Sequence, residues 1–361
     1  MAAARELRWG VVGAGWIAGV FVDDILAPRA SGPAKHVLGA VGTASSIDKV
    51  DKFIDAHWKG DGERPKALGS YQEVYDSPDI DIVYVATPHS LHKQNCLDAI
   101  RAGKHVLCEK PFTINSKEAE EVVAAAKAKG VFLMEGVWTR FFPLAIALEN
   151  KIQEGVIGRV WRSVIQIGLG ADWDSLPQSH RLRDPALGGG ALLDLCIYPI
   201  SYSSMIMGGG KYGEEHPEIK VTSSMDIVKG IDEANVVTLQ YKNPENNPQT
   251  AVCISTVLAD SPLDFGRIEG KKGTITIYTK LGPSCPTGFR VKVGKEEEQD
   301  FPFEHPEGTF GFIHEADAVA QDIFAGRTES ERMPLAETLR VMRLMDQVRA
   351  QNGLVYPQDK E

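Results

Sequence analysis

The chain has 361 residues, of which 43% are hydrophobic and 24% charged, and its formal net charge is −10. This length is comfortable for two domains and long for one. An acidic chain lacks the basic surface that a nucleic-acid partner or a polybasic membrane contact requires, so we expect neither. Asp194 and Pro199 interrupt the most apolar stretch, which leaves no run of about 18 apolar residues, and we expect no membrane span.

Five cysteines are spread along the chain with no CxxC spacing. An odd number without such spacing predicts reduced thiols and a cytoplasmic location. The sequence has no HExxH motif and no Cys/His cluster, and His89 and His92 lie without a matching ligand pair. We therefore predict no metal site.

The first part of the chain alternates apolar strands with amphipathic helices. Strands are expected at residues 7–12, 37–42, 80–86, 104–108 and 131–135, and helices at residues 16–26, 47–57, 71–75, 90–102 and 116–129. This alternation predicts a doubly wound parallel sheet covered on both faces, which is an α/β Rossmann domain over residues 1–137.

Strands follow one another in the second part of the chain. They are expected at residues 161–169, 236–241, 251–257, 265–269, 274–278 and 290–293, before two helices at residues 314–325 and 335–351. This pattern predicts an α+β domain with a large, mostly antiparallel open sheet over residues 138–361.

A glycine turn, G-A-G-W-I-A at residues 13–18, joins the first strand to the first helix. Gly13 permits the tight turn, Gly15 lets the backbone approach a pyrophosphate, and Ala18 replaces the third glycine of the fingerprint. The free N–H groups and the dipole of a helix N-terminus attract phosphate. A turn that serves packing alone has the same letters, but the strand–turn–helix setting favours a dinucleotide site. The expected contacts are Gly13, Gly15, Trp16, Ile17 and Ala18.

The end of the second strand favours NADP over NAD, although NAD stays possible. NAD sites usually carry an Asp or Glu there, and a carboxylate would repel a 2′-phosphate. Here the segment reads G-T-A-S-S at residues 42–46, with no carboxylate before Asp48. We expect phosphate contacts from Thr43, Ser45, Ser46 and Lys49, while Ser45 is equally suited to cap the next helix.

Ligands of an open parallel sheet bind at the carboxyl ends of its strands. Two segments end there, T-P-H-S-L-H at residues 87–92 and E-K-P at residues 109–111. We expect cofactor contacts from Thr87, Pro88, His89, His92, Glu109 and Lys110. For His92, a hydrogen bond that anchors the helix is the alternative. A third segment, G-G-G-A-L-L-D-L-C-I-Y at residues 188–198, places Asp194 and Tyr198 on one face of a helix.

These motifs together resemble the glucose–fructose oxidoreductase/inositol dehydrogenase family. The resemblance covers nearly the whole chain, because E-G-V-W-T-R-F-F-P at residues 135–143 and G-K-K-G-T-I at residues 270–275 also keep the family's order and spacing. The W-T-R-F-F-P string is similar to the one in the branch of the family that includes dimeric dihydrodiol dehydrogenase and NADP-dependent D-xylose 1-dehydrogenase. The resemblance implies an NADP-dependent dehydrogenase of aldoses or trans-dihydrodiols, and a homodimer packed through the second sheet.

The resemblance also implies catalytic roles for Lys110, Asp194 and Tyr198. A tyrosine hydroxyl, with a reference pKa near 10, is a poor base alone, and a nearby ammonium stabilises the phenolate. Lys110 would give that help, and Asp194 would orient the pair or hold a substrate hydroxyl. Structural alternatives are a solvated loop lysine, a carboxylate that only forms an ion pair, and a core tyrosine.

Aromatic and basic side chains near these motifs form the expected substrate wall. Its members are Trp138, Arg140, Phe141, Trp173, His180 and Arg181, together with Asp194 and Tyr198. Phe141 and Phe142 fit a core equally well, and Arg140 fits a pair with an acid.

The sequence departs from the family's pattern through an insertion at residues 27–35 and through Ala44, where many NADP-using relatives carry Arg. Both departures lie near the adenosine end, so they concern cofactor preference and not the reaction class. Two other functions fit the same residues: a carbonyl or imine reductase of a specialised pathway, and a non-catalytic NAD(P)-binding regulator of the same fold. Retention of Lys110, Asp194 and Tyr198 favours an enzyme.

Overall fold

The computed structural model describes residues 5–59, 62–208, 212–213, 217–242, 249–282, 284–305 and 308–360. The chain forms two compact units: unit 1 comprises Met1–Thr113, Lys117–Trp138 and His305–Leu335, and unit 2 comprises Ile114–Ser116, Thr139–Glu304 and Ala336–Glu361. The segment His305–Leu335 thus clusters with unit 1, whereas the sequence analysis assigned it to the second domain. The prediction that residues 1–137 bind the cofactor and residues 138–361 bind the substrate stays a prediction.

Unit 1 contains a six-stranded parallel sheet with the order β3-β2-β1-β4-β5-β6. Its strands are β1 (Glu6–Val12), β2 (Lys35–Gly42), β3 (Lys66–Leu68), β4 (Ile82–Val85), β5 (His105–Glu109) and β6 (Leu133–Gly136). The predicted Rossmann fold is confirmed. The strand β3 was not expected, because three residues are too short to show an alternating pattern.

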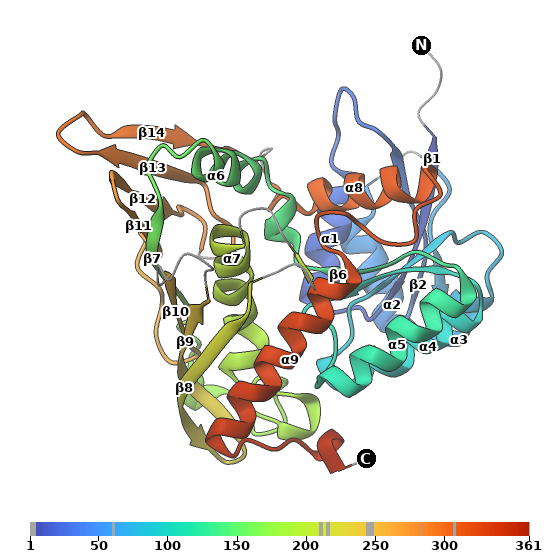
Figure 1. Cartoon of the computed structure of the whole chain (residues 1–361). Helices are drawn as coiled ribbons and strands as arrows, with labels where there is room; N and C mark the ends of the chain where they lie inside the picture. Colours follow the sequence, from blue (N-terminus) through green and yellow to red (C-terminus); the bar gives the residue numbers. More distant parts are fainter. Residues whose placement is uncertain are drawn as a thin grey trace. The chain divides into compact units, whose positions relative to one another are not determined.

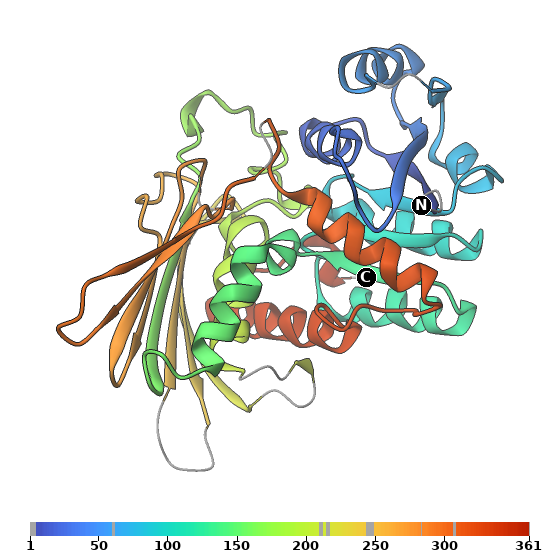
Figure 2. The ribbon, with the colours of Figure 1, turned by 90° about the horizontal axis from the view of Figure 1, so that it is seen from above.

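Helices cover both faces of this sheet (Figure 1). They are α1 (Trp16–Leu26), α2 (Ile47–His57), α3 (Tyr71–Asp76), α4 (His92–Arg101), α5 (Ser116–Lys129) and α8 (Phe312–Phe324). On one face α1 packs beside α8. Phe21 of α1 stacks on Tyr84 of β4 at 3.8 Å and meets Phe312 of α8 edge-on at 6.0 Å. The helix α8, orange in Figure 2, therefore completes a layer that begins near the N-terminus.

Polar contacts fasten α8 to distant parts of unit 1. The carboxylate of Asp24 accepts the N–H groups of Phe310, Gly311 and Phe312 at 2.7 to 3.0 Å. The insertion at residues 27–35 contributes a second tie, because Arg29 bonds both carboxylate oxygens of Asp317 at 2.5 and 2.9 Å. The insertion thus folds back onto α8.

Unit 2 contains an eight-stranded sheet with the order β14-β13-β12-β11-β7-β10-β9-β8. Its strands are β7 (Val160–Gly168), β8 (Ile219–Val228), β9 (Ile231–Tyr241), β10 (Gln249–Thr256), β11 (Gly266–Gly270), β12 (Gly273–Tyr278), β13 (Gly288–Val293) and β14 (Gln299–Pro302). Only β7 and β10 pair in parallel, and the other neighbours are antiparallel. The predicted open antiparallel sheet is confirmed. The edge strands β8 and β14 were missed, because most of their side chains are exposed or half-exposed and give little apolar pattern.

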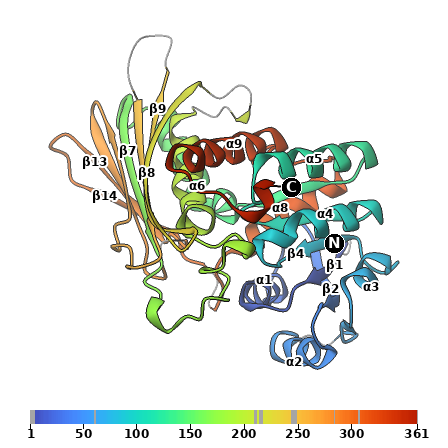
Figure 3. The same ribbon diagram turned by 90° about the horizontal axis from the view of Figure 1, so that it is seen from below.

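The helices α6 (Pro143–Gln153), α7 (Ile197–Met207) and α9 (Leu335–Asn352) lie on one face of this sheet (Figure 3). Among the described residues no helix covers the other face. The N-terminal end of α7 is continuous with a π-helical turn at Leu192–Cys196. The fold therefore brings Asp194 into a π turn and Tyr198 into the following α-helix.

One apolar stretch bears on the expectation that no segment spans a membrane. Pro185–Met207, with a mean hydropathy of 1.2 over its most apolar window, is long and apolar enough to cross a membrane by length and composition. That window is wholly buried inside the protein. Core helices pass the same test, so the stretch is weak evidence for a span.

Candidate functional site

The glycine turn of unit 1 leaves the beginning of α1 open. Gly13 has a φ of 101°, and a Cβ there would lie 2.6 Å from the carbonyl oxygen of Ala86. Gly15 is the N-cap of α1 without a side-chain capping bond, and no atom lies within 4 Å of the position that its Cβ would take. Trp16 is 74% exposed and Ala18 is buried against the sheet. The space beside Gly15 is thus open, as a phosphate group at this helix N-terminus requires.

The loop after β2 presents hydroxyls at its tip. The Thr43 and Ser45 hydroxyls bond each other at 2.9 Å, and the Ser45 N–H donates to the Thr43 hydroxyl at 3.2 Å. The N-cap of α2 is Ser46, whose side chain makes no capping bond, so Ser45 does not cap the helix. Ser45, Ser46 and Lys49 are exposed.

His92 joins the two segments that end β4 and β5. Its ring is fully buried, with Nδ1 2.9 Å from the carbonyl oxygen of Pro111 and Nε2 2.8 Å from that of Thr87. Burial, and then His89, lower the pKa of His92 to about 4, so the neutral ring donates one hydrogen to one of these carbonyls. The expected contact between His92 and a cofactor is therefore replaced by the anchoring role.

The other residues at these strand ends lie as follows. The hydroxyl of Tyr84 donates to the buried carboxylate of Glu109 at 2.5 Å, and the Lys110 N–H donates to the same carboxylate at 3.2 Å. Lys110 is half-buried and is joined to Pro111 by a cis peptide bond. Thr87 and His89 are buried and Pro88 is half-buried. The segment is thus held in shape by its own carboxylate.

A second glycine turn, at residues 188–190 of unit 2, precedes the helix that carries Asp194 and Tyr198. Asp232 of β9 accepts the N–H of Leu192 at 2.8 Å, and the hydroxyl of Tyr356 donates to the carbonyl of Gly189 at 2.6 Å. Gly190 has a φ of 114°, and a Cβ there would collide with Asp232. This turn is filled by the protein's own side chains.

Asp194 and Tyr198 are both 4% exposed. Arg181, whose side chain is 45% exposed, pairs with the Asp194 carboxylate at 2.9 Å. The pair relieves the penalty of a buried charge. Two expected residues thus come together, and the carboxylate lies beneath the guanidinium.

Trp173 and His180 belong to the same loop as Arg181 and are half-buried. The Trp173 indole N–H donates to Glu233 at 2.8 Å, and Arg183 lies 5.0 Å from the ring centre. Burial, and then Arg181, lower the pKa of His180. These residues keep surface that a ligand can reach.

Two aromatic members of the expected substrate wall are core residues. Trp138 is 4% exposed and stacks on Phe312 at 4.0 Å within unit 1. Phe141 is 4% exposed and Phe142 is fully buried. Both side chains thus pack in the core, and the substrate contacts expected from Trp138 and Phe141 stay predictions.

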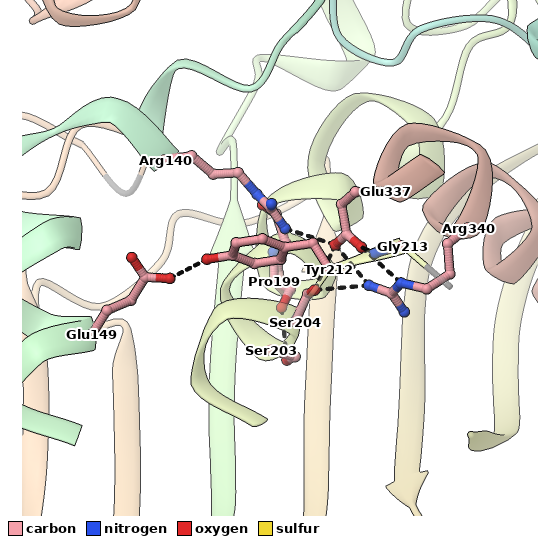
Figure 4. Close-up of polar contacts among 10 residues, drawn as sticks. Arg140, Glu149, Pro199, Ser203, Ser204, Tyr212, Gly213, Glu337 and Arg340 are labelled. Atoms are coloured by element: carbon pink, nitrogen blue, oxygen red, sulfur yellow. Dashed lines mark hydrogen bonds and ion pairs between the residues drawn. The ribbon is translucent and has the colours of Figure 1, made fainter. Parts of the chain in front are cut away.

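Arg140, another member of the expected substrate wall, has its guanidinium in a buried ion network of unit 2 (Figure 4), and its substrate contact stays a prediction. It donates to Ser201 and to Glu337, each at 2.8 Å, and its side chain is 1% exposed. Arg340 and Ser204 bond the same Glu337 carboxylate. Burial alone would raise the pKa of Glu337, but Arg140 and Arg340 hold it well below its usual range.

Sequence reasoning missed Asp232 and Tyr356. The strand β9 begins at Ile231, five residues before the expected strand, so Asp232 was not assigned to the sheet. A signal was present, because an aspartate between Ile231 and the apolar run after Asn235 is unusual in a buried strand. Tyr356 carries no motif that could have placed it beside Gly189.

Comparisons with known proteins agree with this architecture. The model of the oxidoreductase family with an NAD-binding Rossmann fold matches residues 7–137, and the GFO/IDH/MocA C-terminal domain matches residues 146–276. D-xylose 1-dehydrogenase (NADP(+)) of Hypocrea jecorina is 34% identical over 98% of this chain and 93% of its own length. Trans-1,2-dihydrobenzene-1,2-diol dehydrogenase of Danio rerio is 36% identical over 98% of this chain and 99% of its own length.

Among solved structures, a 3-ketoreductase from Actinomadura kijaniata in complex with NADP has a TM-score of 0.77 and 22% identity, covering 96% of this chain and 98% of that one. An aldose-aldose oxidoreductase from Caulobacter crescentus has a TM-score of 0.77 and 23% identity, covering 96% and 97%. These likenesses show the fold. Since family models match most of the chain and relatives share its full length, it belongs to the Gfo/Idh/MocA oxidoreductase family and is an NAD(P)-dependent oxidoreductase.

Proposed function

We propose that this protein is an NADP-dependent dehydrogenase that oxidises a CH–OH group of an aldose or of a trans-dihydrodiol. The observation that carries the proposal is full-length identity of 34% and 36% to enzymes named for these two reactions. The residue assignments come from the motifs shared with the family.

The dinucleotide site fits the residues of unit 1. The open space beside Gly15 and the uncapped first turn of α1 accommodate a pyrophosphate. The exposed hydroxyls of Ser45 and Ser46, with Lys49, accept a 2′-phosphate without carboxylate repulsion. When bound, the cofactor would accept a hydride at its nicotinamide ring as NADP⁺, or supply one as NADPH.

Proton transfer is assigned to Tyr198, with Lys110 as the cation that stabilises its phenolate. Such acid/base help contributes about 10²- to 10⁴-fold to a rate. The Asp194 carboxylate is an acceptor for a substrate hydroxyl, with Arg181 as its counter-ion. Trp173 and His180 complete the proposed substrate contacts, since both keep exposed surface.

The test is turnover followed at 340 nm, with NADP and NAD and with D-xylose, other aldoses and trans-dihydrodiols. We expect NADP-dependent oxidation of one class. The variants Tyr198→Phe and Lys110→Met should each lower kcat at least about tenfold while NADP still binds. The matched controls Tyr278→Phe and Lys127→Met, both outside the named motifs, should keep kcat.

Three outcomes would contradict parts of this proposal. Reduction of a carbonyl or imine without oxidation of any alcohol would indicate a reductase. NADP binding without turnover of any of these compounds would indicate a regulator. Turnover that survives Tyr198→Phe would remove the acid/base assignment.

We also propose a homodimer formed through the face of the unit 2 sheet that no helix covers in the described residues. That face carries half-exposed apolar side chains, including Val164, Val252 and Ile254. Light scattering should give twice the 39.4 kDa chain mass, and a monomer mass would overturn the proposal. The cytoplasmic location stays a prediction, to which the five free, buried cysteines are suited.

A further inference from the structure

Asp232 lies at the N-terminal end of the helix that carries Asp194 and Tyr198. Its carboxylate oxygen Oδ2 accepts two hydrogen bonds of 2.8 Å, one from the Leu192 N–H and one from the side chain of Asn235. The residue is fully buried. A carboxylate at this place satisfies an amide that a helix N-terminus leaves without an intrahelical partner.

The same carboxylate packs against the glycine turn. Its oxygen Oδ1 accepts no hydrogen bond among the described residues, and it occupies the space into which a Gly190 side chain would point. Gly190 also donates its N–H to the carbonyl of Leu182 at 3.0 Å, and its φ of 114° suits glycine. The turn and the carboxylate therefore determine each other's position.

The helix begins with a π turn at Leu192–Cys196, and Asp194 is its middle residue. Such turns are rare and occur often at functional sites. Asp232 holds the first amide of this turn, Ser255 bonds the carbonyl of Ala191 at 3.2 Å, and Tyr356 bonds that of Gly189. Relaxation to an α-helix would rotate Asp194 relative to Tyr198.

We propose that Asp232 is a positioning residue, which keeps the turn Leu192–Cys196 in its π form and thereby sets the directions of Asp194 and Tyr198. The proposal rests on the catalytic roles proposed for those two residues. The essential group is an acceptor atom for the Leu192 N–H, so asparagine can replace aspartate and alanine cannot.

The experiment compares Asp232→Ala and Asp232→Asn with the control Asp226→Asn, an exposed carboxylate on the neighbouring strand β8. Asp232→Ala should lower kcat at least about tenfold, with KM for NADP unchanged because Asp232 belongs to unit 2. Asp232→Asn should keep kcat within about threefold of the wild type, and the control should keep it fully. If Asp232→Ala folds and retains kcat, or if Asp232→Asn loses as much as Asp232→Ala, the proposal is wrong.

Hydrogen exchange provides a readout that does not depend on activity. In Asp232→Ala, amides of residues 191–198 should exchange faster, whereas those of residues 236–241 should not, and Asp232→Asn should restore protection. Unchanged exchange at residues 191–198 would overturn the proposal even if no substrate is ever found. Where Asp232→Ala fails to fold, Asp232→Leu gives the same comparison, because leucine is close to aspartate in shape and has no acceptor atom. If the wild type turns over none of the tested substrates, the proposed function is wrong, whereas the exchange experiment still tests the role of Asp232.

Discussion

Two glycine turns precede the two helices that carry proposed site residues, and they differ in what fills them. The turn at Gly13 and Gly15 leaves the N-terminus of α1 without a capping side chain and with open space around Gly15. The turn at Gly190 is closed by Asp232, which accepts an amide of the following helix. The space beside Gly15 in the first turn is open, as a ligand site requires, and the space beside Gly190 in the second is taken by a residue of the protein itself.

A similar contrast separates three buried charges of unit 2 from the exposed tip of the loop after β2 in unit 1. In unit 2, Arg140, Asp194 and Asp232 are buried, and each is held by other residues of the chain. In unit 1, Ser45, Ser46 and Lys49 are exposed at the loop tip. Whether polar side chains at a turn indicate a ligand site therefore depends on their burial and on their partners within the chain.

The largest effect is expected from a substitution that breaks the buried ion network around Glu337 in unit 2. Arg140→Met leaves the buried carboxylate of Glu337 with one cationic partner fewer, and breaking a buried ion pair costs about 3–5 kcal/mol. We expect a lower midpoint of thermal unfolding, with KM for substrate unchanged in the protein that remains folded. If the KM for substrate instead rises more than about tenfold while the stability is unaltered, Arg140 contacts the substrate.

The next effect fills the open turn. Gly15→Asp adds a carboxylate where no atom lies within 4 Å, so it should be accommodated by the fold and should repel the cofactor phosphates. We expect the Kd for NADP, measured by calorimetry, to rise about 100-fold, with little change in unfolding temperature. Gly15→Ala is the matched control and should weaken binding much less. Unchanged affinity in Gly15→Asp would mean that phosphate binds elsewhere.

A smaller effect follows from the titration of Asp232. Burial raises its pKa to about 7, although its hydrogen bonds from Asn235 and Leu192 act in the opposite direction. The folded state then binds this proton more tightly than the unfolded state, so the contribution to stability falls as pH rises from about 4 to 7. The nearby Cys196 and Tyr356 stay neutral in this range, because burial raises the pKa of both.

The Asp232→Asn variant lacks this titration. Relative to the wild type, its free energy of unfolding should increase by at least about 1 kcal/mol between pH 5 and pH 8. Urea unfolding at the two pH values measures the difference. Parallel pH profiles for the two proteins would show that Asp232 does not titrate in this range.

The smallest expected effect concerns cofactor choice at the exposed tip. Lys49→Glu should raise the KM for NADP about threefold and leave the KM for NAD unchanged, because one exposed charge contributes less than about 1 kcal/mol. Steady-state kinetics with both cofactors measure this ratio, with Lys52→Glu as the control. Equal changes for both cofactors would contradict contact with a 2′-phosphate.

Apolar periodicity and the order of elements along the sequence predicted several helix bounds and the class of both sheets. The helices Trp16–Leu26, Ile47–His57 and Ser116–Lys129 follow from apolar periodicity and have the expected bounds. The class of both sheets follows from the order of strands and helices. The partners of Arg140 could not be predicted, because Glu337 lies almost 200 positions away and no pattern links the two.

Burial likewise depends on the whole chain. Trp138 and Phe141 have the composition of a ligand wall, and only the packing shows that they are core residues. The catalytic assignments of Lys110, Asp194 and Tyr198 still rest on the motifs. The structure adds the Arg181 partner and the π turn, neither of which sequence spacing shows.

The return of α8 to unit 1 has a consequence for synthesis of the protein. The N–H groups that Asp24 accepts belong to residues 310–312, and Phe312 covers both Phe21 and Trp138. A nascent chain that ends after residue 138 therefore leaves the apolar side chains of α1 uncovered. It also leaves the Asp24 carboxylate without the N–H groups that it accepts in the folded protein. Domains usually fold as the ribosome releases them. Here the layer formed by α1 and α8 can be completed only after almost the whole polypeptide has emerged.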